Sequence, residues 1–308
     1  MNQNILSVLD YKDNIYQLID NAIELKTRYK NGQALNHHLA GKRLALLFER
    51  ASTRTHASFT YGMQLLGGSS AYFTKEDLGI KQRETLEDIA LTLSRYTDLI
   101  LYRAIDQEDL KTLAHHATVP VINGLDNNEH PCQILADLLT IKEYKKTLEN
   151  LNFTFIGDGD DNLTHSYMLG CLLCGMNVTI ISPKQYQPNQ HYQRLAAQIS
   201  EEKNKSLQIT DDINEIENAD IVATDTWISY WDEHERTQRL NDFSDYTITQ
   251  QIMSKAKADA LFMHCMPIYY DQEVSYEVAH GPQSIIFDEA ENRMWAQMAL
   301  MIALLNNK

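Results

Sequence analysis

Short apolar runs alternate along this chain with longer amphipathic stretches, and that alternation limits its possible folds more than any other feature. Strand-length runs separated by helix-length periodic segments are typical of α/β proteins with parallel sheets flanked by helices. The predicted helices include 14–29, 85–96, 133–147, 191–203 and 291–305. The predicted strands are 43–48, 70–73, 99–102, 119–123, 153–156, 177–181, 221–224, 261–264 and 284–287.

The predicted strands fall into two groups, which indicates two α/β domains. A length of 308 residues is enough for two separate cores. The boundary is expected near Pro131, where a helix begins.

Bulk composition excludes several classes of partner. A net charge of −15 argues against binding to nucleic acid or to an anionic membrane surface. No apolar stretch reaches the roughly 18 residues that a membrane span needs, and the N-terminal residues do not resemble a secretory signal. Any anionic ligand must therefore be held by a local cationic pocket.

The chain has four cysteines, too few for a disulfide scaffold at this length, and a reducing cytoplasm is expected. Cys171 and Cys174 form a CxxC within the apolar run MLGCLLCGM. That setting favours two packed helix residues over a redox or metal pair.

The segment FERASTRTHASF, residues 48–59, follows an apolar strand and is rich in hydroxyls and cations. Ser52 is a suitable N-cap, and a helix N-terminus offers free N–H groups to an anion. Arg54 adds a guanidinium whose geometry matches phosphate oxygens. The segment therefore predicts a phosphate site, although a capped helix with solvated arginines has the same pattern.

Three further segments carry candidate site residues. In HPCQILAD, Pro131 begins a helix, with His130 just before it and Gln133 on its first turn. In FMHCMP, a strand delivers His264 and Cys265 to its carboxyl end, where α/β sheets place ligands. The segment IGDGDDN lacks the GxGxxG spacing of a dinucleotide site, so a nicotinamide oxidoreductase is disfavoured.

The order FERASTRT, HPCQILAD, TDTWIS, HCMP and ENR closely resembles the transcarbamylase family. The segments HCMP, TDTWIS and GDGDDN resemble its ornithine carbamoyltransferase branch. The resemblance implies a homotrimer and no metal or organic cofactor. It also implies a carbamoyl phosphate domain at 1–132 plus the helix 290–308, and an amine domain at 133–289, with two helices joining them. The implied substrates are carbamoyl phosphate and ornithine.

The resemblance also implies roles for particular residues. The implied carbamoyl phosphate site consists of Ser52, Thr53, Arg54, Thr55, Arg103, His130, Gln133, Cys265, Met266 and Arg293. Of these, Arg103, His130, Cys265 and Arg293 are the implied catalytic residues. The implied ornithine site consists of Asn162, Asp225, Ser229 and Tyr230.

Several positions depart from the family pattern. His56 replaces an arginine, and Asp161 replaces an asparagine beside the amine site. Tyr230 and Trp231 replace Met-Gly in the loop that shapes the amine pocket.

The loop 77–84 is longer than usual, and in the family it reaches a neighbouring subunit's site. Asp77 stands where an acid would repel phosphate. Lys81 and Arg83 have no evident partner in their own domain, and one or the other is expected to supply the missing charge.

Two alternatives to an ornithine enzyme stay open. The aromatic pair favours a carbamoyltransferase for another amine or amino acid. A catalytically silent paralogue that only binds ligand is the other, although Arg54, Arg103 and Arg293 are all present.

Overall fold

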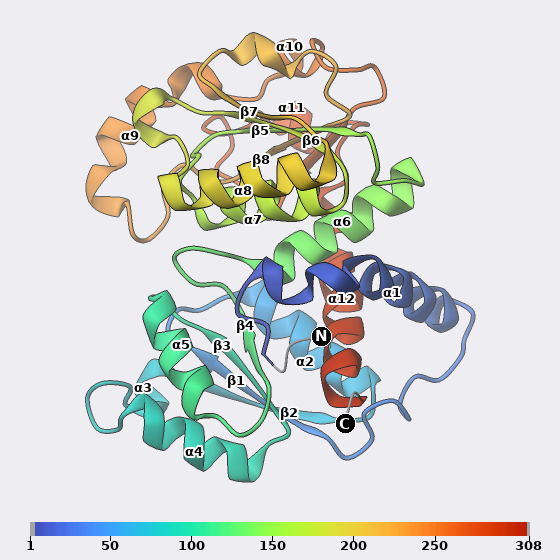
Figure 1. Cartoon of the computed structure of the whole chain (residues 1–308), viewed down its shortest axis with the longest axis vertical. Coiled ribbons are helices and arrows are strands. Elements are labelled where there is room, and N and C mark those ends of the chain that lie inside the picture. The colour runs from blue at the N-terminus through green and yellow to red at the C-terminus, as the bar shows by residue number, and fades with distance from the viewer. Residues whose placement is uncertain (1–3, 307–308) are drawn as a thin grey trace. The chain divides into compact units, whose positions relative to one another are not determined.

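The computed structural model describes residues 4–306, which divide into two compact units. Of the described residues, unit 1 comprises 4–139 and 290–306, and unit 2 comprises 140–289. Each unit is built around one parallel sheet, so the predicted α/β class with two parallel sheets is confirmed (Figure 1). Among the helices of residues 4–306, none combines the length and apolar character needed to cross a membrane.

Unit 1 contains a four-stranded sheet in the order β2-β1-β3-β4. Its strands are β1 (Arg43–Phe48), β2 (Ser69–Thr74), β3 (Leu99–Arg103) and β4 (Val121–Asn123). Its helices are η1 (Val8–Asn14), α1 (Ile15–Lys30), α2 (Thr53–Leu65), α3 (Lys75–Leu78), α4 (Leu86–Tyr96) and α5 (Gln107–His116).

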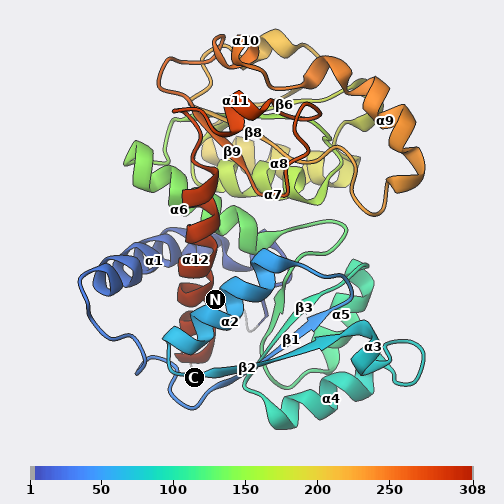
Figure 2. The ribbon, with the colours of Figure 1, turned by 180° about the vertical axis from the view of Figure 1, so that it is seen from behind.

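The core of unit 1 follows from its sequence periodicity. Helix α4 buries Leu86, Ile89, Ala90 and Leu93, which recur at the spacing of one helical face. They pack with apolar side chains of β1, β3 and α5. Figures 1 and 2 show α2 on the face of this sheet opposite to α4 and α5.

Unit 2 contains a five-stranded sheet in the order β7-β6-β5-β8-β9. Its strands are β5 (Asn152–Ile156), β6 (Asn177–Ile181), β7 (Leu207–Thr210), β8 (Ile221–Thr224) and β9 (Leu261–His264). Its helices are α7 (Asn162–Leu173), η2 (Lys184–Tyr186), α8 (Gln190–Lys203), η3 (Ile213–Ile216), η4 (Glu233–Glu235), α9 (Arg236–Asp242), η5 (Ser244–Tyr246), α10 (Gln250–Met253) and α11 (Tyr276–Ala279).

Two helices run from one unit into the other: α6 (Pro131–Lys145) and α12 (Ile286–Asn306). The predicted strand 284–287 is wrong. Ser284 forms only an isolated bridge to Phe262, and the apolar residues that follow begin α12.

The CxxC pair is structural, as expected. Cys171 lies within α7 and Cys174 is its C-terminal cap. Both are buried, and none of the four cysteines forms a disulfide. Burial raises the pKa of Cys174 to about 12, so this thiol is a poor nucleophile or metal ligand.

Candidate active site

The carboxyl ends of β1 and β3 place an N-terminal helix turn beside an arginine. Phe48 at the end of β1 pairs in register with Arg103 at the end of β3. The chain then turns into α2, where the Ser52 hydroxyl accepts a hydrogen bond from the Thr55 N–H at 3.4 Å. The predicted cap is confirmed, and the turn presents positive helix potential at the sheet edge.

Thr55 is the meeting point of two arginines within unit 1. Its buried hydroxyl accepts hydrogen bonds from Arg293 at 3.1 Å and from Arg103 at 3.5 Å. Arg293 belongs to α12, more than two hundred residues away in sequence. These two guanidiniums therefore gather at the first turn of α2.

Gln133 extends the same cluster. Arg293 also donates to the Gln133 side-chain oxygen, and Gln133 donates from Nε2 to Asp137 at 2.7 Å. With its oxygen facing a guanidinium and its amide nitrogen facing a carboxylate, the Gln133 amide is fixed in one orientation.

His130 lies buried among the arginines of unit 1. Burial, and then the positive charges of Arg293, Arg103 and Arg54, lower the pKa of His130 well below its ordinary value. The imidazole is therefore neutral near pH 7. A neutral imidazole donates one N–H, which suits a hydrogen bond to a carbonyl oxygen without adding a proton.

Glu49 supports this edge of the sheet and was not predicted from sequence. Its carboxylate accepts hydrogen bonds from Lys75 at 2.8 Å, Tyr102 at 2.7 Å and the Ile105 N–H at 3.2 Å. Burial opposes its ionisation, but these hydrogen bonds outweigh burial and lower the pKa of Glu49 below its ordinary value. Glu49 thus joins the ends of β1 and β3 to the segment after β2.

The loop 77–84 differs from expectation. Lys81 has a partner in its own unit, since its ammonium lies 2.6 Å from the Asp109 carboxylate. Arg83 donates to the Asp77 carbonyl oxygen at 3.0 Å. The expectation that these two cations lack partners in their own domain is therefore wrong.

Asp77 has a local structural role. Its carboxylate accepts from both the N–H and the hydroxyl of Thr74, while Asp77 N–H donates to that hydroxyl. This is the capping box of α3, which accounts for an acid at this position. His56 likewise packs locally, with its ring 4.2 Å from that of Tyr72.

In unit 2, the ends of β5, β8 and β9 carry the other predicted residues. Asp161 caps α7 by accepting from the Leu163 N–H at 2.8 Å, and Asn162 is the first residue of that helix. Asp225 follows β8. Burial, and then the charge of Asp225, raise the pKa of Asp161 well above its ordinary value, so the two carboxyls act on each other.

Cys265 and Met266 also belong to unit 2, directly after β9. Asp225, His264 and Cys265 offer ligand atoms within 4.8 Å of one another. However, His264 Nδ1 accepts from the Met266 N–H at 2.9 Å, and His264 Nε2 lies 3.2 Å from Glu273. With both ring nitrogens engaged, His264 holds the turn after β9 and is not poised to bind a metal.

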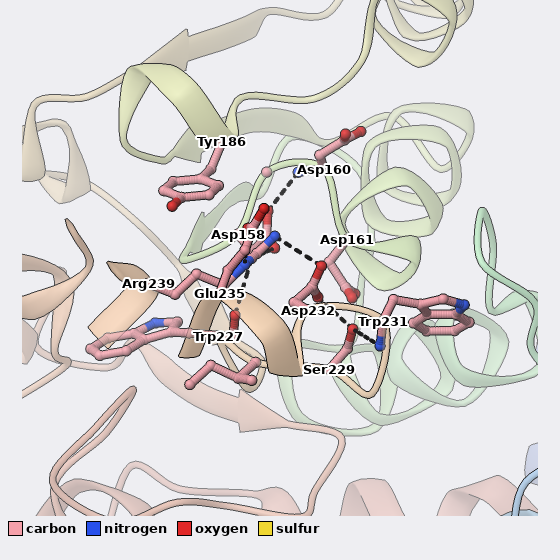
Figure 3. Close-up of polar contacts among 12 residues, drawn as sticks. Asp158, Asp160, Asp161, Tyr186, Trp227, Ser229, Trp231, Asp232, Glu235 and Arg239 are labelled. Carbon is pink, nitrogen blue, oxygen red and sulfur yellow. Dashed lines mark hydrogen bonds and ion pairs between the residues drawn. The ribbon is translucent and has the colours of Figure 1, made fainter. Parts of the chain in front are cut away.

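The loop after β8 contains Ser229, Tyr230 and Trp231. The Ser229 hydroxyl donates to Asp232 at 2.5 Å. The aromatic rings of Tyr230 and Trp231 pack on each other with centroids 3.8 Å apart, and Tyr230 is 36% exposed. In Figure 3 the Trp231 side chain points away from the neighbouring carboxylates.

Comparisons with known proteins agree with the two-unit architecture. Residues 3–143 match the family described as aspartate/ornithine carbamoyltransferase, carbamoyl-P binding domain, and residues 149–304 match the Asp/Orn binding domain of the same family. The chain is 43% identical to an ornithine carbamoyltransferase of Methanobrevibacter smithii, over 98% of this chain and 99% of that protein. A second ornithine carbamoyltransferase, from Oceanobacillus iheyensis, is also 43% identical, over 98% of this chain and 94% of that protein.

Solved structures show the same likeness. Ornithine carbamoyltransferase from Pyrococcus furiosus superposes with a TM-score of 0.95 and 36% identity, covering 99% of this chain and 97% of that one. The anabolic enzyme from Campylobacter jejuni gives a TM-score of 0.92 and 32% identity, covering 99% of each chain.

Proposed function

Because this chain belongs to the aspartate/ornithine carbamoyltransferase family, we propose that it transfers the carbamoyl group of carbamoyl phosphate to the δ-amine of L-ornithine. The products are L-citrulline and phosphate. The observation that carries the proposal is the cluster of Thr55, Arg103, His130, Gln133 and Arg293 at one edge of the unit 1 sheet.

Carbamoyl phosphate carries a phosphate, a carbonyl oxygen and an amide, and the cluster offers a matching group for each. The first turn of α2, with its cap (residues 52–55), supplies N–H and hydroxyl donors to the phosphate, and Arg54 lies within it. Arg103 and neutral His130 donate to the carbonyl oxygen. Gln133, whose orientation Arg293 fixes, accepts from the carbamoyl NH₂.

The reaction then proceeds by nucleophilic attack at the carbonyl carbon. The neutral δ-amine of ornithine forms the new C–N bond, and negative charge develops on the carbonyl oxygen. Thr55, Arg103 and His130 stabilise that charge as preorganised donors. The C–O bond to phosphate breaks, the phosphate leaves with the electron pair, and the nitrogen loses a proton. Holding both substrates together contributes up to about 7–11 kcal/mol in favourable cases.

The amine-side residues lie in unit 2. Asp225 suits the α-ammonium of ornithine, and a bound ammonium would oppose the upward shift that burial and Asp225 impose on the pKa of Asp161. Ser229 and Tyr230 lie on the adjoining loop, and Asn162 offers its amide to the α-carboxylate. Cys265 and Met266 are proposed to contact the carbamoyl group.

Three wider features are part of the same proposal. The chain works as a homotrimer in the cytoplasm and serves arginine metabolism. The substrate domains are 1–132 with 290–308 for carbamoyl phosphate and 133–289 for ornithine. The loop with Lys81 and Arg83 serves a neighbouring subunit.

Transfer to another amine is the second candidate, favoured by Tyr230 and Trp231, whose rings pack at a 33° tilt where the family has Met-Gly. One assay separates the two. The protein is given carbamoyl phosphate with ornithine, lysine or putrescine, and phosphate and the carbamoylated product are measured. Citrulline from ornithine at the highest kcat/KM supports the proposal. Preference for another amine establishes the second candidate, and no turnover with any amine identifies a silent paralogue.

A further inference from the structure

Arg239 is a buried cation of unit 2 that the proposed reaction does not use. It lies on α9 and is 7% exposed. Its guanidinium contacts three carboxylates: Asp158 at 2.5 Å, Asp232 at 3.0 Å and Glu235 at 3.2 Å. Figure 3 shows these groups converging on the guanidinium.

The partners of Arg239 come from different segments, so one side chain ties several loops together. Asp158 precedes the turn that leads to Asp161 and α7. Arg239 also donates to the Trp227 carbonyl oxygen at 3.1 Å, within the loop after β8. Its guanidinium carbon lies 4.8 Å from the centre of the Tyr186 ring, which belongs to the segment after β6.

Ser229 is linked to Arg239 through one carboxylate. Arg239 contacts Oδ1 of Asp232, and the Ser229 hydroxyl donates to Oδ2 of the same carboxylate at 2.5 Å. The Asp232 N–H in turn donates to the Ser229 carbonyl oxygen at 3.1 Å. Figure 3 shows the dashed contacts between these side chains. The Arg239 guanidinium therefore sets where the Ser229 hydroxyl lies.

On the N-terminal side of Ser229, the loop after β8 is held in place at Trp227. Trp227 is buried and stacks on Phe243, with ring centroids 5.4 Å apart and planes 20° from parallel. Arg239 holds the carbonyl of that same residue. Ser229 thus lies between two points, Trp227 and Asp232, that are both fixed by Arg239.

The carboxylates around Arg239 make the arrangement of these loops depend on its guanidinium. Burial raises the pKa of Asp158 to about 6, although the Arg239 guanidinium opposes that shift. Asp232 adds further negative charge beside Asp158. Without the guanidinium, the carboxylates of Asp158 and Asp232, which lie on separate loops, would repel each other at a site shielded from water. The two loops would then move apart.

We propose that Arg239 is a positioning residue for the amine substrate: through Asp232 and the Trp227 carbonyl, it holds Ser229 where that residue contacts the α-amino end of ornithine. The inference rests on the proposed function, which places Ser229 in the amine site. A lysine cannot replace Arg239, because a single ammonium lacks the planar fork that serves Asp158, Asp232 and a carbonyl at once.

The test compares two arginines of the same helix in the full chain. Arg236 on α9 pairs with Glu233 at 2.9 Å but is 41% exposed in its side chain. Arg239→Lys is expected to raise KM for ornithine at least tenfold and to leave KM for carbamoyl phosphate within twofold. Arg236→Lys is expected to change neither by more than twofold. An Arg239→Lys variant that is folded and has an ornithine KM within twofold of wild type overturns the inference.

A second pair of variants keeps the test decisive if Arg239→Lys fails to fold. Asp232→Asn leaves the contacts of Arg239 with Asp158, Glu235 and Trp227 in place. It is expected to raise KM for ornithine severalfold in the wild-type background and to add nothing in a Ser229→Ala background, because it acts through Ser229. Equal increases in both backgrounds overturn the inference.

Wild-type kinetics separate this inference from the proposed function. Failure of the wild-type protein to make citrulline counts against ornithine as substrate. If it carbamoylates lysine or putrescine, the same KM comparison with that amine tests Arg239. If it uses no amine, the proposed function and the positioning role fall together.

Discussion

Arg54 is the arginine on the first turn of α2, and its positive charge is one of three that lower the pKa of His130. Replacing it with alanine removes the guanidinium proposed to hold the leaving phosphate. We expect Arg54→Ala to cost at least about 3 kcal/mol of transition-state stabilisation, measured as a fall in kcat/KM for carbamoyl phosphate. The reason is that charge-assisted contacts to a departing anion strengthen in the transition state.

Steady-state kinetics and the circular dichroism spectrum check this expectation together. Arg95→Ala is the control, since Arg95 is an exposed arginine of α4 in the same unit. The control should behave as wild type. A folded Arg54→Ala variant with near-normal kcat/KM would show that phosphate does not bind at this turn.

Glu49 provides a second prediction about a single residue, and it concerns the stability of the fold. Glu49→Gln leaves Lys75 without its carboxylate, and it should cost about 1–3 kcal/mol of unfolding free energy at pH 7. The pKa of Glu49 is lowered in the folded state, so its stabilisation is complete above the ordinary glutamate pKa and is lost as pH falls through the lowered value. The gap between variant and wild type should therefore narrow in acid.

Urea unfolding at pH 7 and at successively lower pH measures that gap. Glu108→Gln is the matched control, because Glu108 also accepts from a lysine, Lys111, at 2.8 Å but has a 76% exposed side chain. Its loss should stay within about 0.5 kcal/mol. The stabilising role of Glu49 would be contradicted if Glu49→Gln lost no more unfolding free energy than the control, or if its loss did not change with pH.

Sequence alone predicted residues whose partners lie within one motif, but not those whose partners are distant. Ser52 was recognisable as a cap because Thr55 follows it closely in the chain. Glu49 and Arg239 were not singled out from the sequence, since nothing local distinguishes a buried ion from an exposed one. Lys81 was misjudged for the same reason, because its partner Asp109 lies on α5, distant in sequence.

At the scale of elements, the turn between α2 and β2 depends on Gly67. This residue has φ +88°, and a Cβ there would lie 1.9 Å from the Asn36 carbonyl oxygen. Gly41 has a similar φ of +75° with no atom within 4 Å of its would-be Cβ. Gly67→Ala should destabilise the chain by about 3–5 kcal/mol and Gly41→Ala by about 1–2, because only the first adds a clash to the backbone strain.

Thermal and urea unfolding of both glycine variants test that difference. Similar losses for Gly67→Ala and Gly41→Ala would mean that the turn relaxes around the added methyl group. The unfolding free energy of Gly67→Ala should remain the lower of the two under every condition in which both variants unfold reversibly.

Strands and helices with clear periodicity were predicted, and ambiguous short runs were not. The ends of α4 and α8 match the prediction closely because a capping residue precedes each apolar face. Edge strand β7 was missed, since its four residues are all at least partly exposed and do not form an apolar run. The run 284–287 was mistaken for a strand because four apolar or small residues do not distinguish a strand from the first turn of a helix.

At the scale of the whole molecule, the shared active site remains a prediction. Lys81 and Arg83 have partners in their own chain, so the prediction now rests on family resemblance alone. An Arg54→Ala chain mixed with a Lys81→Ala/Arg83→Ala chain should recover activity, because some sites would combine two intact halves. Activity is measured after unfolding and refolding the two chains together.

Size-exclusion chromatography with light scattering must first show mixed oligomers for that result to count. Each variant refolded alone is the control and should stay inactive. Mixed oligomers without recovery would show that the loop serves only its own chain.

Unit 1 is discontinuous in sequence, since residues 290–306 complete it after the whole of unit 2. During synthesis, unit 2 is complete before most of α12 leaves the ribosome, whereas the earlier part of unit 1 is still without that helix. Arg293 arrives with that helix and only then reaches Thr55 and Gln133. The anion cradle is thus completed only after unit 2 has been synthesised, so a truncated chain lacking α12 has no complete cradle.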